Sequence, residues 1–572
     1  MKKLINESHQ AVREALEGYV DLSPSLALLE GENIVVRATI PPRDQRKVAL
    51  ISGGGSGHEP AHAGYVGEGM LTAAVAGDIF TSPSVDAIVA ATLAVAGPAG
   101  VLYIVKNYTG DRLNFSLAAE IARREGIPAE LVFVADDASL RDLVAPERRR
   151  GIAGTVLVHK IAGAAAEAGK TLAEVTRLAK AAAAEVVTMG VGLGSCTVPS
   201  AGKPSFELGR DELEFGLGIH GEKGVRRDKM QSADAIVEVI LDTLLKDMNE
   251  RPQPVSREVA LLVNGLGATP PMELSIVARH ALRTLRSKGW TVSRAWAGDF
   301  MTALEMPGCS LSLLPLDPER KTLLDAASKA TAWPGQGMIA GGRNVMASNA
   351  ATNIEAPVSA LAGPITALMR AVVTEVADAL EDAEPELTDL DSRAGDGDLG
   401  ASMKRGAQAL RALPEAAYNS PEALLLSMAN SLRRTIAGSS GPFYAAALMR
   451  AGRMLSGQVE PDASGWGTAF TDAAVSVSEI GGAKVGDRTM YDALAAAVDG
   501  WHGAISEGST GLAAWEAATR SARDAAAGTA AMKPGLGRAS YLGDRAVGVP
   551  DGGAVAVAIW MGAIARALRN AG

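Results

Sequence analysis

The spacing of apolar residues changes its period partway along the chain, and only a multidomain fold accommodates that change. Up to about residue 330, short runs of β-branched and other apolar residues alternate with helical patterns. The predicted strands are 47–52, 100–106, 130–135, 154–159, 259–263 and 291–297. Strands that alternate with helices are typical of an α/β architecture.

The second half of the chain is predicted to be entirely helical. Alanine-rich segments with helical spacing and no convincing strand pattern cover 364–383, 422–439, 444–455, 491–506, 512–527 and 554–567. Between the halves, small and polar residues replace the periodic pattern, as they do in linkers. We therefore predict an α/β domain at 1–335, a linker at 336–356 and an all-helical domain at 357–572.

Composition and charge exclude several classes of protein. Of the 572 residues, 47% are hydrophobic and 21% are charged, which is the balance of a folded globular protein. Lys and Arg number 55 against 65 Asp and Glu, and a net charge of −10 argues against a nucleic-acid partner. Two cysteines, Cys196 and Cys309, are too few for a disulfide framework. No signal peptide is visible at the N-terminus, so we expect a cytoplasmic protein.

An uncharged stretch of membrane-span length, 87–105, is divided by Gly97-Pro98. We interpret it as a buried helix, a turn and a strand, and we predict no membrane span.

Two further motifs resemble known functional motifs but are not interpreted as functional sites. The segment 163–171 resembles a phosphate-binding Walker loop but has five residues between its glycines instead of four, and it follows a helical pattern. His58 and His62 match a zinc-protease spacing, but Pro60 opposes the helix that such a site needs.

Three glycine-rich or polar loops of the first half carry candidate chemistry. The strand at 47–52 leads into 53–60 (GGGSGHEP), a run of exposed N–H donors that ends near the imidazole of His58. The strand at 100–106 leads into 106–111 (KNYTGD), which places Asp111 in the following loop. In 216–222 (GLGIHGE), His220 stands among glycines. Each loop by itself also suits an ordinary turn.

An acidic loop in the helical half predicts a cation site. Asp391, Asp396 and Asp398 lie within eight residues around helix-breaking glycines. Clustered carboxylates repel one another unless a hard cation neutralises them, and Mg²⁺ prefers oxygen ligands. A calcium-binding EF-hand is excluded because neither possible start places Gly and Glu at the required positions. A solvated turn is the alternative.

Further glycine-rich loops at 437–442, 481–490 and 537–544 offer N–H groups and hydroxyls suited to phosphate oxygens. Arg538 adds a cation to the last of them. Together with the acidic loop they suggest a nucleotide site, although helix-capping loops in a bundle have a similar composition.

Taken together, these motifs resemble the dihydroxyacetone kinase family in its single-chain, ATP-dependent form. The resemblance rests on 53–60, 106–111, 216–222, the acidic loop, 486–494 (GDRTMYDAL) and 537–545 (GRASYLGDR), which occur in the family's order. It implies an N-terminal ketose-binding α/β domain of two subdomains and a C-terminal barrel of antiparallel helices that binds Mg-ATP. It also implies homodimers, with active sites that one chain completes for the other.

The resemblance assigns roles to individual residues. His220 forms a covalent hemiaminal with the substrate carbonyl, while His58 and Asp111 handle the hydroxyl that is phosphorylated, Asp111 as base. The implied substrate contacts are Gly55, Ser56, Gly57, His58, Lys106 and Asp111. The implied Mg²⁺ ligands are Asp391, Asp396 and Asp398. The implied nucleotide contacts are Leu399, Gly400, Ala401, Ser402, Ser440, Gly441, Gly481, Met490, Arg538, Asp551 and Gly552.

One departure and several alternatives accompany this interpretation. Gly552 stands where the family pattern leads us to expect proline. Dihydroxyacetone is the first candidate substrate, and the four-carbon ketose erythrulose is the alternative because the motifs do not define the pocket's far wall. A non-catalytic ketose sensor, a phosphoprotein in place of ATP, and a flavin-nucleotide cyclase side activity also stay open.

Overall fold

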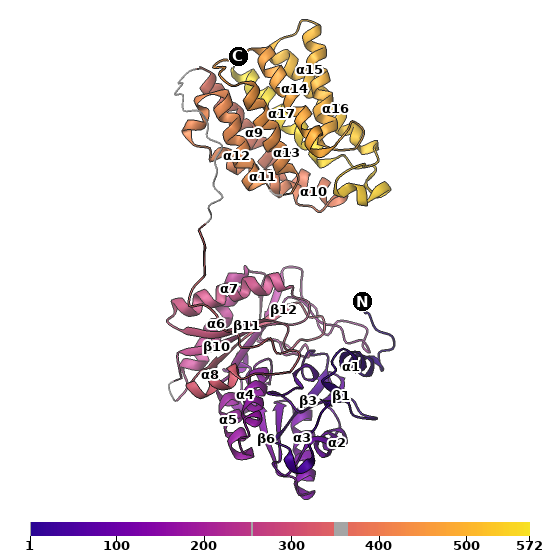
Figure 1. The fold of residues 1–572 in the computed structure, drawn as a ribbon, viewed down its shortest axis with the longest axis vertical. Helices are drawn as coiled ribbons and strands as arrows, with labels where there is room; N and C mark the ends of the chain where they lie inside the picture. Colours follow the sequence, from indigo (N-terminus) through magenta and orange to yellow (C-terminus); the bar gives the residue numbers. More distant parts are fainter. Residues whose placement is uncertain (1, 253–254, 348–363, 437, 572) are drawn as a thin grey trace. The chain divides into compact units, whose positions relative to one another are not determined.

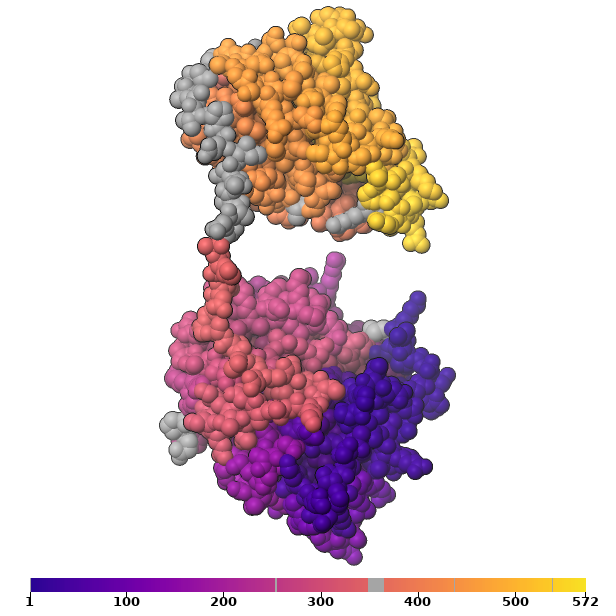
Figure 2. Space-filling view, in the orientation of Figure 1, coloured from indigo at the N-terminus to yellow at the C-terminus, as the bar shows by residue number. Residues whose placement is uncertain are grey.

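The computed structural model describes residues 2–252, 255–347, 364–436 and 438–571. It divides into two compact units, Met1–Val345 and Met346–Gly572. Figure 1 shows that the first combines sheets with helices and the second is built from helices, which confirms the predicted fold class. Figure 2 shows side chains filling the space between the elements of each unit. Residues 348–356 of the predicted linker lie outside the described residues.

The first unit contains two six-stranded sheets, one in each subdomain. The first sheet has the order β1-β2-β4-β3-β5-β6, in which β3 is parallel to β4 and β5, and β5 to β6. Parallel neighbours end at the same edge, so the carboxyl ends of β3 and β5 lie together. The strands are β1 (Leu26–Leu28), β2 (Ile34–Arg37), β3 (Ala49–Ser56), β4 (Ala73–Ile79), β5 (Val101–Lys106) and β6 (Ala129–Val134).

The second sheet has the order β11-β10-β12-β7-β8-β9, and all its pairs are antiparallel except β10 with β11. Its strands are β7 (Val187–Gly192), β8 (Glu212–Phe215), β9 (Arg226–Lys229), β10 (Glu258–Gly265), β11 (Thr291–Gly298) and β12 (Gly308–Pro315). The helices of the first unit are α1 (Ala11–Asp21), α2 (Val85–Val95), α3 (Thr109–Arg124), α4 (Thr155–Glu167), α5 (Leu172–Glu185), α6 (Ala233–Asn249), α7 (Pro271–Ser287) and α8 (Pro318–Asp325).

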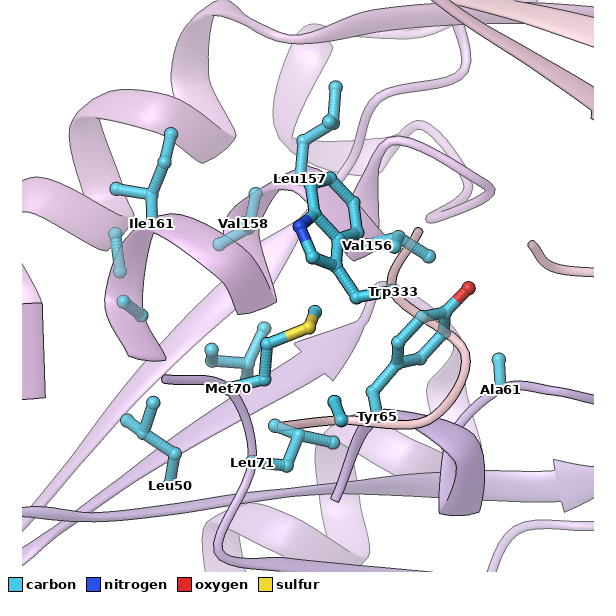
Figure 3. Close-up of a cluster of buried hydrophobic side chains, with 14 of the residues drawn as sticks. Leu50, Ala61, Tyr65, Met70, Leu71, Val156, Leu157, Val158, Ile161 and Trp333 are labelled. Atoms are coloured by element: carbon cyan, nitrogen blue, oxygen red, sulfur yellow. The ribbon is translucent and has the colours of Figure 1, made fainter. Parts of the chain in front are cut away.

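Helix α4 joins the two subdomains through the largest hydrophobic core. Its residues pack in one cluster with Leu50 and Leu102 of the first sheet and Leu262 of the second. Figure 3 shows four apolar residues of α4 beside Tyr65, Met70 and other buried side chains. The predicted strand at 154–159 is therefore wrong. A helix that is buried all round carries a continuous apolar run, and such a run has the same pattern as a buried strand.

Other local predictions in this unit are confirmed. The uncharged stretch 87–105 is divided between α2, which ends at Val95, and β5, which begins at Val101. The Walker-like segment is the end of α4 followed by Thr171, which caps α5 in a reciprocal capping box with Glu174.

The described helices of the second unit form a closed ring. Contacts run from α9 through α11, α12, α13, α14, α15, α16 and α17 and back to α9, with α10 beside α11. Its described residues contain no strand. The helices are α9 (Pro364–Asp382), α10 (Glu384–Ala394), α11 (Leu399–Arg411), α12 (Pro421–Thr435), α13 (Ser440–Met454), α14 (Ala463–Gly481), α15 (Met490–Ser506), α16 (Gly511–Gly528) and α17 (Gly552–Ala571).

The ring encloses an apolar cavity of about 600 Å³ whose described lining residues carry no charge. Within the described residues, α17 is long and apolar enough by length and composition to cross a membrane. In the fold it is a helix of the ring, and its alanines, such as Ala554 and Ala556, are buried against the neighbouring helices. Small residues at these positions let the helix axes approach closely.

Candidate active site

The backbone of β3 forms one wall of a site at the end of the first sheet. Gly54 and Gly55 have no room for a side chain. A β-carbon on Gly54 would lie 2.6 Å from Nζ of Lys106, and one on Gly55 would lie 2.5 Å from the amide nitrogen of Thr81. Glycine here allows neighbouring groups to approach the main chain closely. The Ser56 hydroxyl donates to the Gly77 carbonyl at 2.7 Å, so its hydrogen is held inside the sheet.

His58 follows β3 and is fully buried. Its Nδ1 lies 2.8 Å from the carbonyl oxygen of Thr302, so Nδ1 carries the proton and donates. Thr302 follows β11 of the other subdomain, and this bond ties the two together. Burial, and next the charge of Lys106, hold the pKa of His58 well below its usual range. The neutral ring therefore presents Nε2 as a bare acceptor, and that atom is buried with no partner among the described residues.

His220 lies in the loop between β8 and β9 and faces His58. Its Nδ1 lies 2.9 Å from Oε1 of Glu222, and its backbone N–H donates to Oε2 of the same carboxylate at 2.8 Å. Burial raises the pKa of Glu222, but hydrogen bonds from His220 and its charge outweigh burial and lower it to about 2. A carboxylate accepts only, so Nδ1 of His220 holds a proton, and in the neutral form of the ring the lone pair stands on Nε2.

Aromatic rings enclose the two imidazoles. The ring of His220 meets those of His58, Phe80 and Tyr108 edge to face, with centroids 4.9, 5.1 and 4.7 Å apart. Phe80 also stacks on His58 at 5.1 Å. Phe80 and Leu304 have φ of 57° and 55°, a left-handed conformation that is rare for bulky residues and often marks functional sites.

Lys106 and Asp111 complete the charged part of this site. Lys106 ends β5, is fully buried, and has a pKa lowered by burial against the opposing effect of Asp111. Asp111 lies in the first turn of α3, and its Oδ1 is buried without a hydrogen-bond partner among the described residues. A β-carbon on Gly54 would lie 3.6 Å from Oδ2 of Asp111. The structure thus brings the ends of β3 and β5, the start of α3 and the His220 loop together.

The acidic loop joins α10 to α11 in the second unit, with Asp391 in the last turn of α10 and Asp396 and Asp398 after it. The ligand oxygens of Asp391, Asp396 and Asp398 all lie within 4.8 Å of one another. Oδ2 of Asp391 accepts from the backbone N–H groups of Asp398 and Leu399, at 2.9 and 3.2 Å, which folds the loop around that carboxylate. Three convergent carboxylates fit a hard divalent cation.

The implied nucleotide contacts gather at helix ends of this unit. Asp551 precedes α17, and its Oδ1 accepts from the Ala554 N–H at 2.8 Å. Burial raises the pKa of Asp551 to about 6. A β-carbon on Gly552 would lie 2.7 Å from Leu399, so the Leu399 side chain fills the space that a proline would need. Met490 begins α15 and borders Gly553. Residues Gly400, Ala401 and Ser402 form the first turn of α11.

Three other implied contacts lie at the start of α13 or next to it. Ser440 and Gly441 start that helix, and Gly481 ends α14 with Phe443 of α13 next to its Cα. The backbone of Arg538 is in a short 3₁₀-helix. The Arg538 side chain and Ala437 lie outside the described residues.

Several residues of the first site escape sequence reasoning. Glu222 stands inside the quoted 216–222 motif, and its position two residues after His220 is the signal that was available. Tyr108 stands inside the quoted 106–111 motif, although no role was assigned to it. Phe80 and Thr302 approach from parts of the chain outside the motifs, and the sequence offers no signal for their contacts with the two histidines.

Comparison with known proteins finds a matching domain family for each of the two units. Residues 17–332 match the Dak1 domain and residues 393–566 match the DAK2 domain. Triokinase/FMN cyclase of Homo sapiens is 44% identical over 579 residues, covering 100% of both chains. D-erythrulose kinase of Mycolicibacterium smegmatis is 36% identical and covers 98% of this chain and 97% of the relative.

A solved structure agrees. The dihydroxyacetone kinase of C. freundii, in complex with AMP-PNP and Mg²⁺, superposes with a TM-score of 0.62 at 35% identity over 99% of each chain. The chain therefore belongs to the dihydroxyacetone kinase family, as a ketose or triose kinase that carries a Dak1 and a DAK2 domain in one polypeptide.

Proposed function

We propose that this chain phosphorylates a short-chain ketose with ATP, with dihydroxyacetone as the first candidate, after His220 has captured the ketose as a hemiaminal. The observation that supports this most is the hydrogen bond from Nδ1 of His220 to Glu222, 2.9 Å long. It leaves the Nε2 lone pair free for attack on a carbonyl carbon.

The capture step involves the ketose carbonyl, the imidazole of His220 and the carboxylate of Glu222. A bond forms between Nε2 of His220 and the carbonyl carbon, and the electron pair of the carbonyl π bond moves to oxygen, which takes up a proton from solvent. The ring then carries a positive charge, which the Glu222 carboxylate offsets. Imidazole adds to ketones and aldehydes but not to alcohols, so this step selects dihydroxyacetone over glycerol by reactivity.

The remaining groups serve the hydroxyl that is phosphorylated. Nε2 of His58 and Oδ1 of Asp111 are buried acceptors without partners in the described part of the chain, which suits them to bind that hydroxyl and, for Asp111, to accept its proton. The backbone of Gly55, Ser56 and Gly57 and the ammonium of Lys106 contact the other ketose oxygens.

In the second unit, Asp391, Asp396 and Asp398 hold Mg²⁺, and the helix ends around Leu399, Gly441, Met490 and Asp551 hold the nucleotide. When bound, Mg-ATP supplies the phosphoryl group and the metal charge that stabilises its transfer. The C. freundii relative, solved with AMP-PNP and Mg²⁺, supports this choice of cofactor.

The deciding experiment measures Mg-ATP-dependent ADP release with dihydroxyacetone, both erythrulose enantiomers, glyceraldehyde and glycerol. We expect dihydroxyacetone to give the highest kcat/KM and glycerol to be inert. His220→Ala should lose at least about a hundredfold in kcat/KM. Full turnover and selectivity in His220→Ala would refute the hemiaminal. No ADP release with any sugar, despite ketose binding in a titration, would favour a sensor or a phosphoprotein donor.

Two of the relatives suggest alternatives that enzyme assays can test: another ketose as substrate, and a second activity on flavin nucleotides. The erythrulose kinase of M. smegmatis shares 36% identity over nearly the whole chain, so a higher kcat/KM for erythrulose would change the substrate but keep the mechanism. The human relative is also named FMN cyclase, and its 44% identity motivates incubation with flavin nucleotides. A cyclic product that persists in His220→Ala and disappears in Asp396→Ala would assign that reaction to the second unit.

A further inference from the structure

A second set of buried polar side chains lies next to Lys106. Nζ of Lys106 is 2.9 Å from Nε2 of His62, and Nδ1 of His62 is 3.4 Å from the hydroxyl of Ser52. The same hydroxyl is 3.2 Å from Nε2 of His159. Ser52, Lys106 and His159 are fully buried, and His62 is 6% exposed. Buried polar groups on this scale persist only when hydrogen bonds satisfy them.

The hydrogens of this network have a consistent arrangement. The Ser52 hydroxyl donates to the carbonyl of Ile104 at 2.7 Å, so its oxygen can only accept from the two imidazoles. His62 therefore carries its proton on Nδ1, and His159 carries its proton on Nε2. The remaining nitrogen of His62, Nε2, is an acceptor, and Lys106 donates to it. A second proton on His62 would leave two cationic donors facing each other.

Lys106 needs such an acceptor. A lysine side chain has several rotatable bonds and a compact charge, so burial alone does not orient its ammonium. Here the ammonium approaches the strand backbone closely, since Nζ lies 2.6 Å from where a β-carbon on Gly54 would stand. Nε2 of His62 accepts one of its N–H bonds, and the negative charge of Asp111 attracts the ammonium without a direct hydrogen bond among the described residues.

We propose that His62, oriented by Ser52, is a positioning residue that aims the ammonium of Lys106 at the ketose. This inference rests on the proposed function, in which Lys106 contacts ketose oxygens. Burial, and next the charge of Lys106, lower the pKa of His62 well below its usual range, in keeping with a neutral ring that accepts. The role gives a function to the imidazole that stands four residues after His58.

The test compares His62→Leu with His62→Gln in the full-length chain. Leucine removes the acceptor, whereas the glutamine amide oxygen reaches the position of Nε2. We expect His62→Leu to raise the KM for dihydroxyacetone about 10- to 100-fold with the KM for ATP unchanged, the loss typical of a charged hydrogen bond. His62→Gln should recover most of that loss. Ser52→Ala should shift the same KM in the same direction by a smaller factor.

Thr92→Val is the matched control. Its hydroxyl bonds to the Tyr103 hydroxyl at 2.7 Å in the core of the same subdomain, and it touches no residue of the site. It should lower the thermal midpoint and leave the ketose KM unchanged. The proposal is overturned if His62→Leu behaves like Thr92→Val, or if His62→Gln is as impaired as His62→Leu.

Two readouts separate this inference from the proposed function. If His62→Leu does not fold, the ketose KM of Ser52→Ala still decides: it should be raised by a small factor, and a wild-type value in Ser52→Ala would overturn the proposal. Titration of dihydroxyacetone without nucleotide tests ketose binding directly. Absence of both binding and turnover in the wild type would refute the proposed function, whereas wild-type activity with unaffected His62 variants would refute only the positioning role.

Discussion

His220 and His58 differ in the group that accepts the hydrogen bond from Nδ1–H. In His58 that group is a backbone carbonyl, and in His220 it is the carboxylate of Glu222. A carboxylate stabilises a positive charge on the ring, whereas a carbonyl offers only its dipole. The two imidazoles therefore suit different chemical roles. His220 suits formation of a covalent bond through Nε2, and His58 suits hydrogen bonding in its neutral form.

Substitutions at Glu222 should separate the charge from the hydrogen bond. Glu222→Gln keeps an acceptor and loses the charge, so we expect kcat/KM for dihydroxyacetone to fall about tenfold. Glu222→Leu loses both and should fall by about 10² or more. Steady-state kinetics with ketose as the varied substrate measures both effects. Equal activity in all three proteins would remove Glu222 from the capture step.

Buried histidines should make the first unit sensitive to acid. Burial, and next the charge of Lys106, lower the pKa of His159 from 6.5 to about 3. Between these values the unfolded chain binds a proton that the folded chain does not. The stability is therefore complete above pH 6.5 and is lost as the pH falls toward 3, at up to about 1.4 kcal/mol per pH unit.

His159→Gln removes this titration while its amide N–H can still donate to Ser52. We expect hydrogen exchange in α4 to accelerate less steeply on acidification from pH 7 to 4 in the variant than in the wild type. Identical pH slopes would show that His159 does not contribute. His58 and His62, whose pKa values are lowered in the same direction, account for the acid sensitivity that persists.

Sequence motifs predict which residues of the first site carry chemistry, but not what holds them. His58, Lys106, Asp111 and His220 stand beside glycines or at strand ends, and both signals are local. The partner of His58 is a carbonyl 244 positions away, which no local pattern encodes. The residues that meet at this site were therefore predictable, whereas their orientation follows only from the packing of the two subdomains.

At the level of elements, the sequence pattern misidentified α4 but identified the acidic loop as an interruption between helices. The run at 154–159 was predicted as a strand because β-branched residues dominate it, yet burial on all sides makes it a helix. Elements α10, α11 and α14 were not predicted, because their small and polar residues weaken the helical period. The loop between α10 and α11 was recognised correctly because glycines and carboxylates interrupt any period.

Asp398→Asn should uncouple the second unit from Mg²⁺. Without the metal, the variant relieves repulsion among three carboxylates, so its thermal midpoint should equal or exceed that of the wild type. Added Mg-ATP should raise the midpoint of the wild type and have little effect on the variant. Asp389→Asn is the control, because Asp389 is an exposed neighbour paired with Arg393 outside the trio. Equal Mg²⁺-dependent shifts in both variants would contradict the assignment.

At the level of the whole molecule, each unit contains complete cores of its own. Three large clusters lie within the first unit and two within the second. The division between 345 and 346 falls inside the stretch where the sequence loses its period. Changes of hydrophobic period thus predicted the architecture, because each unit buries its apolar residues independently.

A fragment of residues 1–345 should fold and bind ketose without turning over ATP. Its dihydroxyacetone affinity, measured by titration, should lie within about threefold of that of the full-length chain. The same fragment carrying His220→Ala is the control and should bind far more weakly. An insoluble fragment, or one that needs residues 346–572 to bind ketose, would show that the first unit is not autonomous.

The crowded glycines of β3 limit which substitutions the ketose site tolerates. A new side chain there would collide with Lys106 or the main chain, so a change of substrate size has to arise elsewhere. Phe80 and Leu304 are the positions we expect to change, since the side chains of both border Gly57 and the ring of Phe80 also stacks on His58. Natural diversification toward longer ketoses, and laboratory libraries that seek it, should accumulate their successful changes at these two residues and leave the strand untouched.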